Sequence, residues 1–146
     1  FRYGGNMSIL VMVLVISLTL LTASAWATTY QYISADKTKA YLANEVAMNI
    51  VDIQVEQEFN QHHLPQALPT FAYPVKSEAD RAKLEAVLPQ LQDSEVPVVV
   101  VCPRGGGGAK RTYDYLAQRG IAAERLFILE NGQQGWPHPD LLEKQK

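Results

Sequence analysis

Residues 98–111 read Val-Val-Val-Val-Cys-Pro-Arg-Gly-Gly-Gly-Gly-Ala-Lys-Arg. A continuous run of β-branched apolar residues is typical of a strand that is buried on both faces. Residues 109–116 have the composition of a helix, so the four glycines belong to a turn between strand and helix. This order predicts that Cys102 lies at the carboxyl end of a central strand, where open α/β sheets bind their ligands.

The glycine-rich turn predicts an anion site beside Cys102, which is the only cysteine of the chain. Glycines allow successive backbone N–H groups to converge, and the start of a helix adds partial positive charge. The same field favours a thiolate, which is the nucleophilic form of cysteine. The pattern therefore indicates a thiol nucleophile that faces an anionic substrate. The alternative is an inert cysteine that only packs in the core.

The composition indicates one globular domain. The chain has 146 residues, of which 47% are hydrophobic and 19% are charged. Its net charge of −2 and the lack of a basic stripe give no support to nucleic-acid binding. A single cysteine provides neither a Cys-x-x-Cys redox pair nor a Cys/His zinc cluster. We therefore expect no metal, no cofactor and no nucleic-acid partner.

The first residues have the pattern of an export signal. No charged residue occurs between Arg2 and Asp36, and residues 9–21 are almost wholly apolar. Ala25-Trp26-Ala27 is the small-x-small pattern of a signal peptidase site. We expect residues 1–27 to be a cleaved signal peptide and the protein to be periplasmic or secreted. The alternative is an uncleaved membrane anchor, which is the one case in which we expect a membrane partner.

Strand and helix signals alternate through the rest of the chain, up to a polar C-terminal tail at residues 138–146. Short apolar runs predict strands at residues 30–33, 49–53, 97–101 and 126–129, and helices are expected near residues 34–44, 55–62, 77–91 and 109–119. The alternation predicts an α/β fold with a mainly parallel central sheet and helices on both faces.

Two of the expected helices carry more detailed signals. In the first, Ala40, Tyr41 and Leu42 are expected to face the core. In the third, Ser77 and Asp80 form a capping box at the start, and Pro89 is expected to end or kink the helix.

Three further patches accompany the loop at residues 102–109. They are Ile50-Val51-Asp52-Ile53 with Glu58-Phe59 after it, His63-Leu64-Pro65-Gln66-Ala67, and Glu130-Asn131-Gly132 leading to Trp136. Their order and spacing resemble the rhodanese-like family of single-domain sulfurtransferases. The resemblance implies a three-layer fold and one rhodanese-like domain at residues 28–137. The usual pattern has Arg at position 54, where this chain has Gln, and polar or basic residues at positions 107 and 108.

The resemblance also implies an activity and a set of site residues. Cys102 is then the catalytic residue, and the substrate- and anion-binding loop is Pro103, Arg104, Gly105, Gly106, Gly107, Gly108 and Ala109. Supporting roles fall to Asp52, Lys110 and Arg111. The implied reaction moves a sulfane sulfur from thiosulfate, or a similar small sulfur-containing anion, to cyanide, a thiol or a protein acceptor through a persulfide on Cys102.

Two other functions stay open. A cysteine-dependent phosphatase or arsenate reductase needs Arg at the sixth position after the cysteine to clamp an oxyanion, and that position is Gly108. A non-enzymatic carrier or binding module for persulfide or sulfide needs only the thiol and the loop. His62 and His63 lie in a turn far along the chain, and we expect them to be structural.

Overall fold

The computed structural model describes residues 29–145. The predicted leader and its cleavage site lie outside these residues. Within them, no helix is both long enough and apolar enough to span a membrane.

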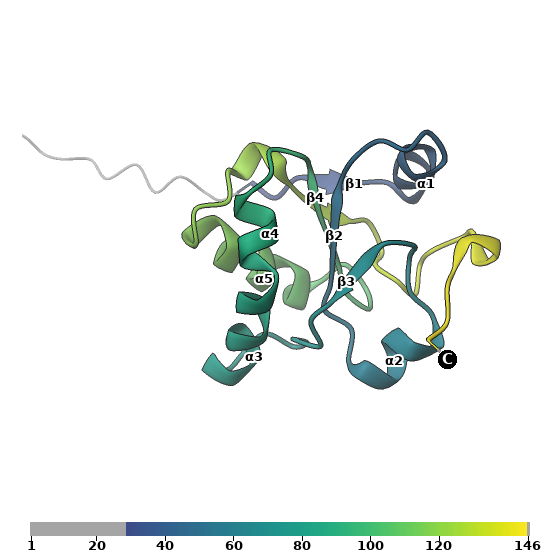
Figure 1. Ribbon diagram of the computed structural model, residues 1–146. Helices are drawn as coiled ribbons and strands as arrows, with labels where there is room; N and C mark the ends of the chain where they lie inside the picture. The colour runs from purple at the N-terminus through teal and green to yellow at the C-terminus, as the bar shows by residue number, and fades with distance from the viewer. Residues whose placement is uncertain (1–28, 146) are drawn as a thin grey trace, which may run out of the picture.

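A five-stranded parallel sheet forms the centre of the molecule, in the order β1-β5-β4-β2-β3 (Figure 1). The strands are β1 (Tyr32–Ile33), β2 (Asn49–Asp52), β3 (Ala67–Pro69), β4 (Val98–Val101) and β5 (Leu126–Leu129). The valine run is therefore the middle strand, with β2 and β5 as its parallel neighbours. All four valines of β4 are fully buried, as the apolar run predicts.

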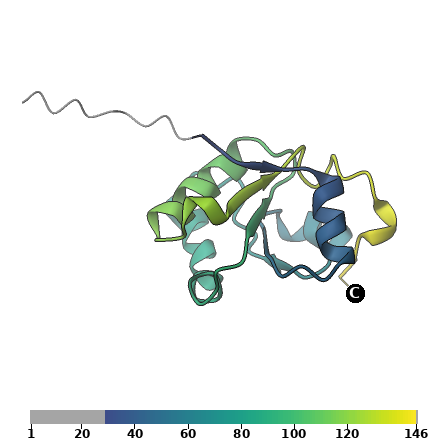
Figure 2. The same ribbon diagram turned by 90° about the horizontal axis from the view of Figure 1, so that it is seen from above.

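Helices cover both faces of this sheet. They are α1 (Ala35–Ala43), α2 (Glu56–Gln61), α3 (Glu78–Ala82), α4 (Leu88–Gln92) and α5 (Gly107–Gln118). Val98 and Val100 pack in the same cluster as residues of α4 and α5, whereas Val99 and Val101 pack toward α1 and the C-terminal segment. Figure 2 shows α5 and α1 on opposite sides of the strands. The predicted α/β architecture, with a parallel sheet between two helical layers, is confirmed.

Helix α1 begins where the sequence predicts, but one core assignment is wrong. The N-cap side chain of Ser34 accepts a hydrogen bond from the Lys37 N–H at 3.1 Å. Ala40 is exposed, and Thr38 is fully buried in its place. At 100° per residue, position 40 lies opposite the face formed by positions 35, 38 and 42, which turns toward the sheet.

The segment after Ser77 is three short pieces instead of one helix. The capping box of Ser77 and Asp80 is present, but α3 passes into the 3-10 helix η1 (Lys83–Ala86) before α4 begins. Pro89 lies in the first turn of α4, where backbone N–H groups make no intrahelical hydrogen bond, so the lack of an N–H costs nothing there. It therefore starts a helix, and the prediction that it ends or kinks one is wrong.

The edge strand β3 has no clear signal in the sequence, because its neighbourhood contains two prolines. It pairs with β2 through Val51 opposite Leu68, and Pro69 closes it. A proline is tolerated in an edge strand because such a strand has a neighbour on one side only. An N–H group on its other side has no strand to donate to, so its loss costs little.

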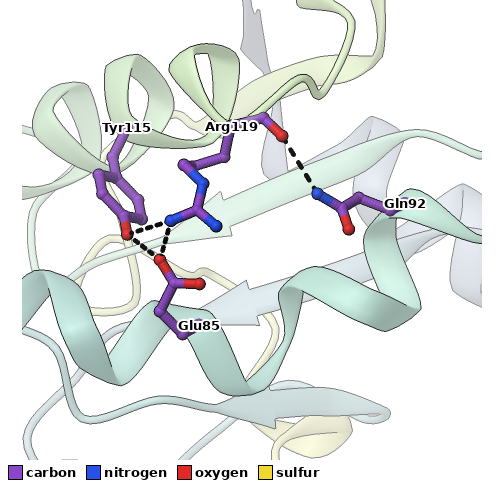
Figure 3. A network of polar contacts seen from close by, with 4 residues as sticks. All are labelled: Glu85, Gln92, Tyr115 and Arg119. Atoms are coloured by element: carbon purple, nitrogen blue, oxygen red, sulfur yellow. Dashed lines mark hydrogen bonds and ion pairs between the residues drawn. The ribbon is translucent and has the colours of Figure 1, made fainter.

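Polar contacts hold α5 against the α3–α4 segment (Figure 3). The carboxylate of Glu85, in η1, accepts hydrogen bonds from the Tyr115 hydroxyl and the Arg119 guanidinium. The side-chain amide of Gln92 donates to the Arg119 carbonyl at 3.2 Å. These contacts lie at the carboxyl end of α5, at the opposite end from the glycine loop.

Candidate active site

Cys102 directly follows the central strand and is one of the residues that line a cavity. Its side chain is buried, with 2% of the residue exposed, and Sγ accepts a hydrogen bond from the Gly105 N–H at 2.9 Å. The cavity measures about 260 Å³, and the residues that line it are Tyr73, Cys102, Arg104, Gly106, Gly107, Gly108 and Arg111. The thiol, three loop glycines and two cations therefore meet in one place.

The turn after Cys102 depends on a glycine with a left-handed backbone. Gly105 has φ of +72°, and a Cβ on it would lie 3.0 Å from both the Asn131 nitrogen and the Leu129 oxygen. Helix α5 begins at Gly107, two residues earlier than predicted, with Gly106 as its N-cap. The loop is therefore short, and its last glycines already belong to the first helical turn.

A second turn, after β5, holds the loop from behind. The N–H groups of Gln133 and Gln134 donate to the carbonyls of Cys102 and Pro103 at 2.8 and 2.9 Å. Gly132, with φ of +62°, lies so close that a Cβ there would be 2.2 Å from the Cys102 oxygen. The sequence marks this turn as part of a motif, but its role in positioning the thiol is visible only in the fold.

The cavity has a positive lining. Arg104 and Arg111 line it, and none of its lining residues carries a carboxylate. Across residues 29–145, neither arginine forms an ion pair. An anion is the ligand that such a lining favours, because it supplies the missing negative charge.

Other residues singled out by the sequence lie outside the cavity lining. Pro103 and Ala109 are buried behind it, and Gly105 is the hydrogen-bond donor to the thiol. Lys110 is exposed, with its ammonium 5.5 Å from the centre of the Tyr30 ring. His63 is buried and stacks on Phe59, with ring centres 3.9 Å apart.

Tyr73 is a lining residue that sequence reasoning missed. It lies between β3 and α3, and its ring packs so closely on α5 that a Cβ on Gly108 would be 3.0 Å from a ring carbon. Gly108 is thus kept bare by a contact from a segment 35 residues away in the sequence. No local signal announces such a contact.

Asp52 lies away from the thiol cavity, in a buried polar pair with Gln54. Its carboxylate accepts hydrogen bonds from the Gln54 backbone N–H at 2.9 Å and from the Gln54 side-chain amide at 3.0 Å. Burial raises the pKa of Asp52 from its ordinary value of 3.8 to about 6, although both hydrogen bonds act in the opposite direction. Asp52 therefore organises the end of β2 and does not contact the cavity.

This buried carboxyl predicts a stability that falls as pH rises. In the unfolded chain Asp52 ionises near pH 3.8, whereas in the folded chain it keeps its proton to about pH 6. Between these values the folded state binds more protons, so the free energy of unfolding falls by on the order of 3 kcal/mol. We expect urea unfolding from pH 4 to pH 7 to show this fall in the wild type. Subtracting the pH dependence of the free energy of unfolding of Asp52→Asn from that of the wild type isolates the contribution of Asp52. The same pH dependence in both proteins would contradict the prediction.

A second, separate cavity of about 330 Å³ lies on the α2 side of the same sheet edge. It is lined by Gln54, Glu58, Gln61, His62, Gln133, Gln134, Trp136 and Leu142. Among the residues that the structure describes, the side-chain amide of Gln133 is buried without a hydrogen-bond partner. Within residues 29–145 there is no group of three or more His, Cys, Asp or Glu side chains that is able to hold a metal ion.

The comparisons with known proteins agree on one fold. A family model described as a rhodanese-like domain matches residues 34–138. No curated protein matches the chain. A rhodanese-like domain protein from Staphylococcus aureus has 23% sequence identity and a TM-score of 0.60, with 80% of this chain and 99% of that chain covered.

Two further solved structures share the fold but differ in what their titles state. A yeast protein tyrosine phosphatase of the rhodanese family has 15% identity and a TM-score of 0.57, over 75% of this chain and 85% of that chain. A thiosulfate sulfurtransferase from Pseudomonas aeruginosa has 20% identity and a TM-score of 0.56. The match covers 80% of this chain but only 21% of that enzyme.

Proposed function

This chain belongs to the rhodanese-like domain family, and on that premise we propose that it is a sulfurtransferase in which Cys102 carries the sulfur. The observation that carries the proposal is the position of the thiol. Cys102 lines a cavity together with three loop glycines, Arg104, Arg111 and Tyr73. This lining suits a nucleophile that attacks an anion and then holds a negatively charged product.

The first half-reaction forms a persulfide. The Cys102 thiolate attacks the outer sulfur of thiosulfate, the S–S bond of thiosulfate breaks, and sulfite leaves with the bonding electron pair. The total charge of −3 on the reactants equals that of the persulfide anion and sulfite, and no proton is needed. The hydrogen bond from the Gly105 N–H to Sγ, at 2.9 Å, stabilises negative charge on sulfur before the attack.

The second half-reaction removes the sulfur. A nucleophilic acceptor, cyanide in an assay or a thiol in the cell, attacks the terminal sulfur of the persulfide and releases the Cys102 thiolate. Because the persulfide is anionic, the site needs hydrogen-bond donors more than a general base. The bare backbone of Gly106 and Gly107, at the start of α5, supplies donors of this kind.

Phosphatase chemistry is the less suitable use of the same cavity. Transfer of a phosphoryl group to the thiolate requires an acid that protonates the departing alcohol. None of the residues that line the Cys102 cavity is a carboxylic acid or a histidine. Position 108, where an oxyanion-clamping arginine is expected in that class, is a glycine whose missing side chain leaves room for Tyr73.

The proposed place of action is outside the cytoplasm, and this rests on the sequence of residues 1–27 alone. The proposed partners follow from the two half-reactions: a small sulfur-containing anion as donor and a thiol or a protein as acceptor.

Intact mass after incubation with thiosulfate tests the proposal. We expect the protein to gain the mass of one sulfur atom, to lose it on addition of cyanide, and to release one thiocyanate for each sulfur lost. With both reagents in excess, we expect many thiocyanate ions per chain. A single slow transfer without turnover would favour a carrier, and no adduct at all would favour a silent binding module.

A further inference from the structure

The guanidinium of Arg111 is held at the cavity by an atom from a distant loop. Arg111 lies in the second turn of α5, beyond the glycine loop, and it lines the Cys102 cavity. Its Nε and Nη2 both donate to the Pro74 carbonyl, at 3.0 and 2.9 Å. Because two donors converge on one oxygen, the orientation of the planar group is defined, and not only its position.

These contacts occupy one edge of the guanidinium and leave the other edge available. A guanidinium has five N–H donors in a fixed fork. Nε–H and one proton of Nη2 are used by Pro74, which leaves the second Nη2 proton and both Nη1 protons. Among residues 29–145, Nη1 has no hydrogen-bond partner, and Arg111 has no ion-pair partner. A second two-pronged donor edge is therefore free on a residue that lines the same cavity as Cys102.

Gly107 is what allows the guanidinium to lie there. A Cβ on Gly107 would be 2.8 Å from Nη1 of Arg111 and 3.4 Å from both Cζ and Nη2. A side chain at position 107 would therefore displace the guanidinium, whereas the φ of Gly107 is not in the left-handed region and does not itself require glycine. The loop has no side chain at position 107, and the side chain of Arg111, from the next helical turn, occupies that space instead.

We infer that Arg111 determines donor specificity by binding the oxyanion of the sulfur donor through its Nη1–Nη2 edge. The protein then prefers donors that carry a sulfonate-type oxyanion, such as thiosulfate, over sulfane-sulfur donors without oxygen atoms, such as polysulfide. This inference rests on the proposed sulfurtransferase function. In the first half-reaction the bonds that form and break are those between sulfur atoms, and Arg111 binds the donor without taking part in them.

Substitution by lysine separates the shape of the donor edge from its charge. Lys keeps the positive charge but loses the fork. We expect Arg111→Lys to raise KM for thiosulfate by about tenfold or more, with a smaller change in kcat, and to leave KM for polysulfide nearly unchanged. Arg119→Lys, at the C-cap of the same helix and outside the cavity, is the matched control. An equal change for both donors would overturn the inference.

The contact between Gly107 and Arg111 has its own test. Gly107→Ala should push the guanidinium away, so we expect it to raise KM for thiosulfate in the wild-type background. The same change should have little further effect when Arg111 is already Lys, because the two substitutions then remove one interaction. Additive effects on the free energy of binding would mean that Gly107 acts independently of Arg111.

Binding of inorganic sulfate measures the arginine edge without any sulfur chemistry. We expect sulfate, titrated at constant ionic strength, to shift the NMR signals of the Gly105–Gly108 amides and of the Arg111 Nε–H. The affinity should fall about tenfold or more in Arg111→Lys. If this holds while no persulfide forms, the proposed function fails but the oxyanion site stands. If sulfate binds wild type and Arg111→Lys equally, or binds neither, the inference is wrong, whatever the transferase assay gives.

Discussion

Cys102→Ser is expected to abolish sulfur transfer, with kcat/KM for thiosulfate lowered by on the order of a thousandfold or more. A serine hydroxyl is a poor nucleophile toward sulfane sulfur at neutral pH. Its oxygen also cannot form the S–S bond of a persulfide. The fold should tolerate the change. The Gly105 N–H that donates to Sγ at 2.9 Å is able to donate to a hydroxyl oxygen in the same position.

Stability and chemistry are measured separately in this variant. We expect the free energy of unfolding, from urea titration, to stay within about 1 kcal/mol of the wild type. Intact mass after thiosulfate treatment should show no added sulfur. Activity close to the wild-type level in a correctly folded Cys102→Ser protein would sink the proposal that this thiol carries the sulfur.

Gly132→Ala is expected to have the largest effect on stability and to damage the site at the same time. A Cβ at this position would lie 2.2 Å from the Cys102 oxygen and 2.6 Å from the backbone nitrogens of Arg104 and Gly105. All three atoms belong to backbone, so no rotamer change relieves the contact. The φ of +62° adds strain for any residue with a Cβ. We expect a loss of about 3 kcal/mol or more.

Gly120→Ala is the matched control for that change. Gly120 also has a positive φ, of +90°, but a Cβ there would meet nothing within 4 Å. Its cost should therefore be about 1 kcal/mol, from backbone strain alone. We expect urea unfolding to separate the two variants by about 2 kcal/mol, and thiosulfate turnover to fall in Gly132→Ala only. Equal stabilities would show that the loop yields easily to the turn behind it.

Features that depend on neighbours along the chain were predictable from the sequence. Four consecutive valines predict the central strand because a run of β-branched apolar residues is typical of a strand buried on both faces. Ser34 and Ser77 mark helix starts because a capping side chain bonds to an N–H only three residues away. The loop after Cys102 follows from its glycines and from the helix that must begin after them.

Predictions failed where packing competes with local preference. The segment after Ser77 has a helical pattern of apolar residues, yet it breaks into α3, η1 and α4. Leu84, Leu88 and Leu91 are still buried against the sheet, so the apolar residues keep their place while the backbone between them changes pitch. A weak helical preference over a few residues yields to the burial of three leucines.

By itself, the sequence determined the alternation of strands and helices, the position of Cys102 at the end of the central strand and the glycine loop after it, because each depends on residues close together in the chain. Only the tertiary structure decided the rest of the site. It brings Tyr73 and the Pro74 carbonyl from the β3–α3 loop and the turn at Gly132 from beyond β5. These segments meet because the carboxyl ends of parallel strands lie on the same side of the sheet. The spacing of residues in the sequence does not predict which backbone carbonyl accepts the hydrogen bonds of Arg111.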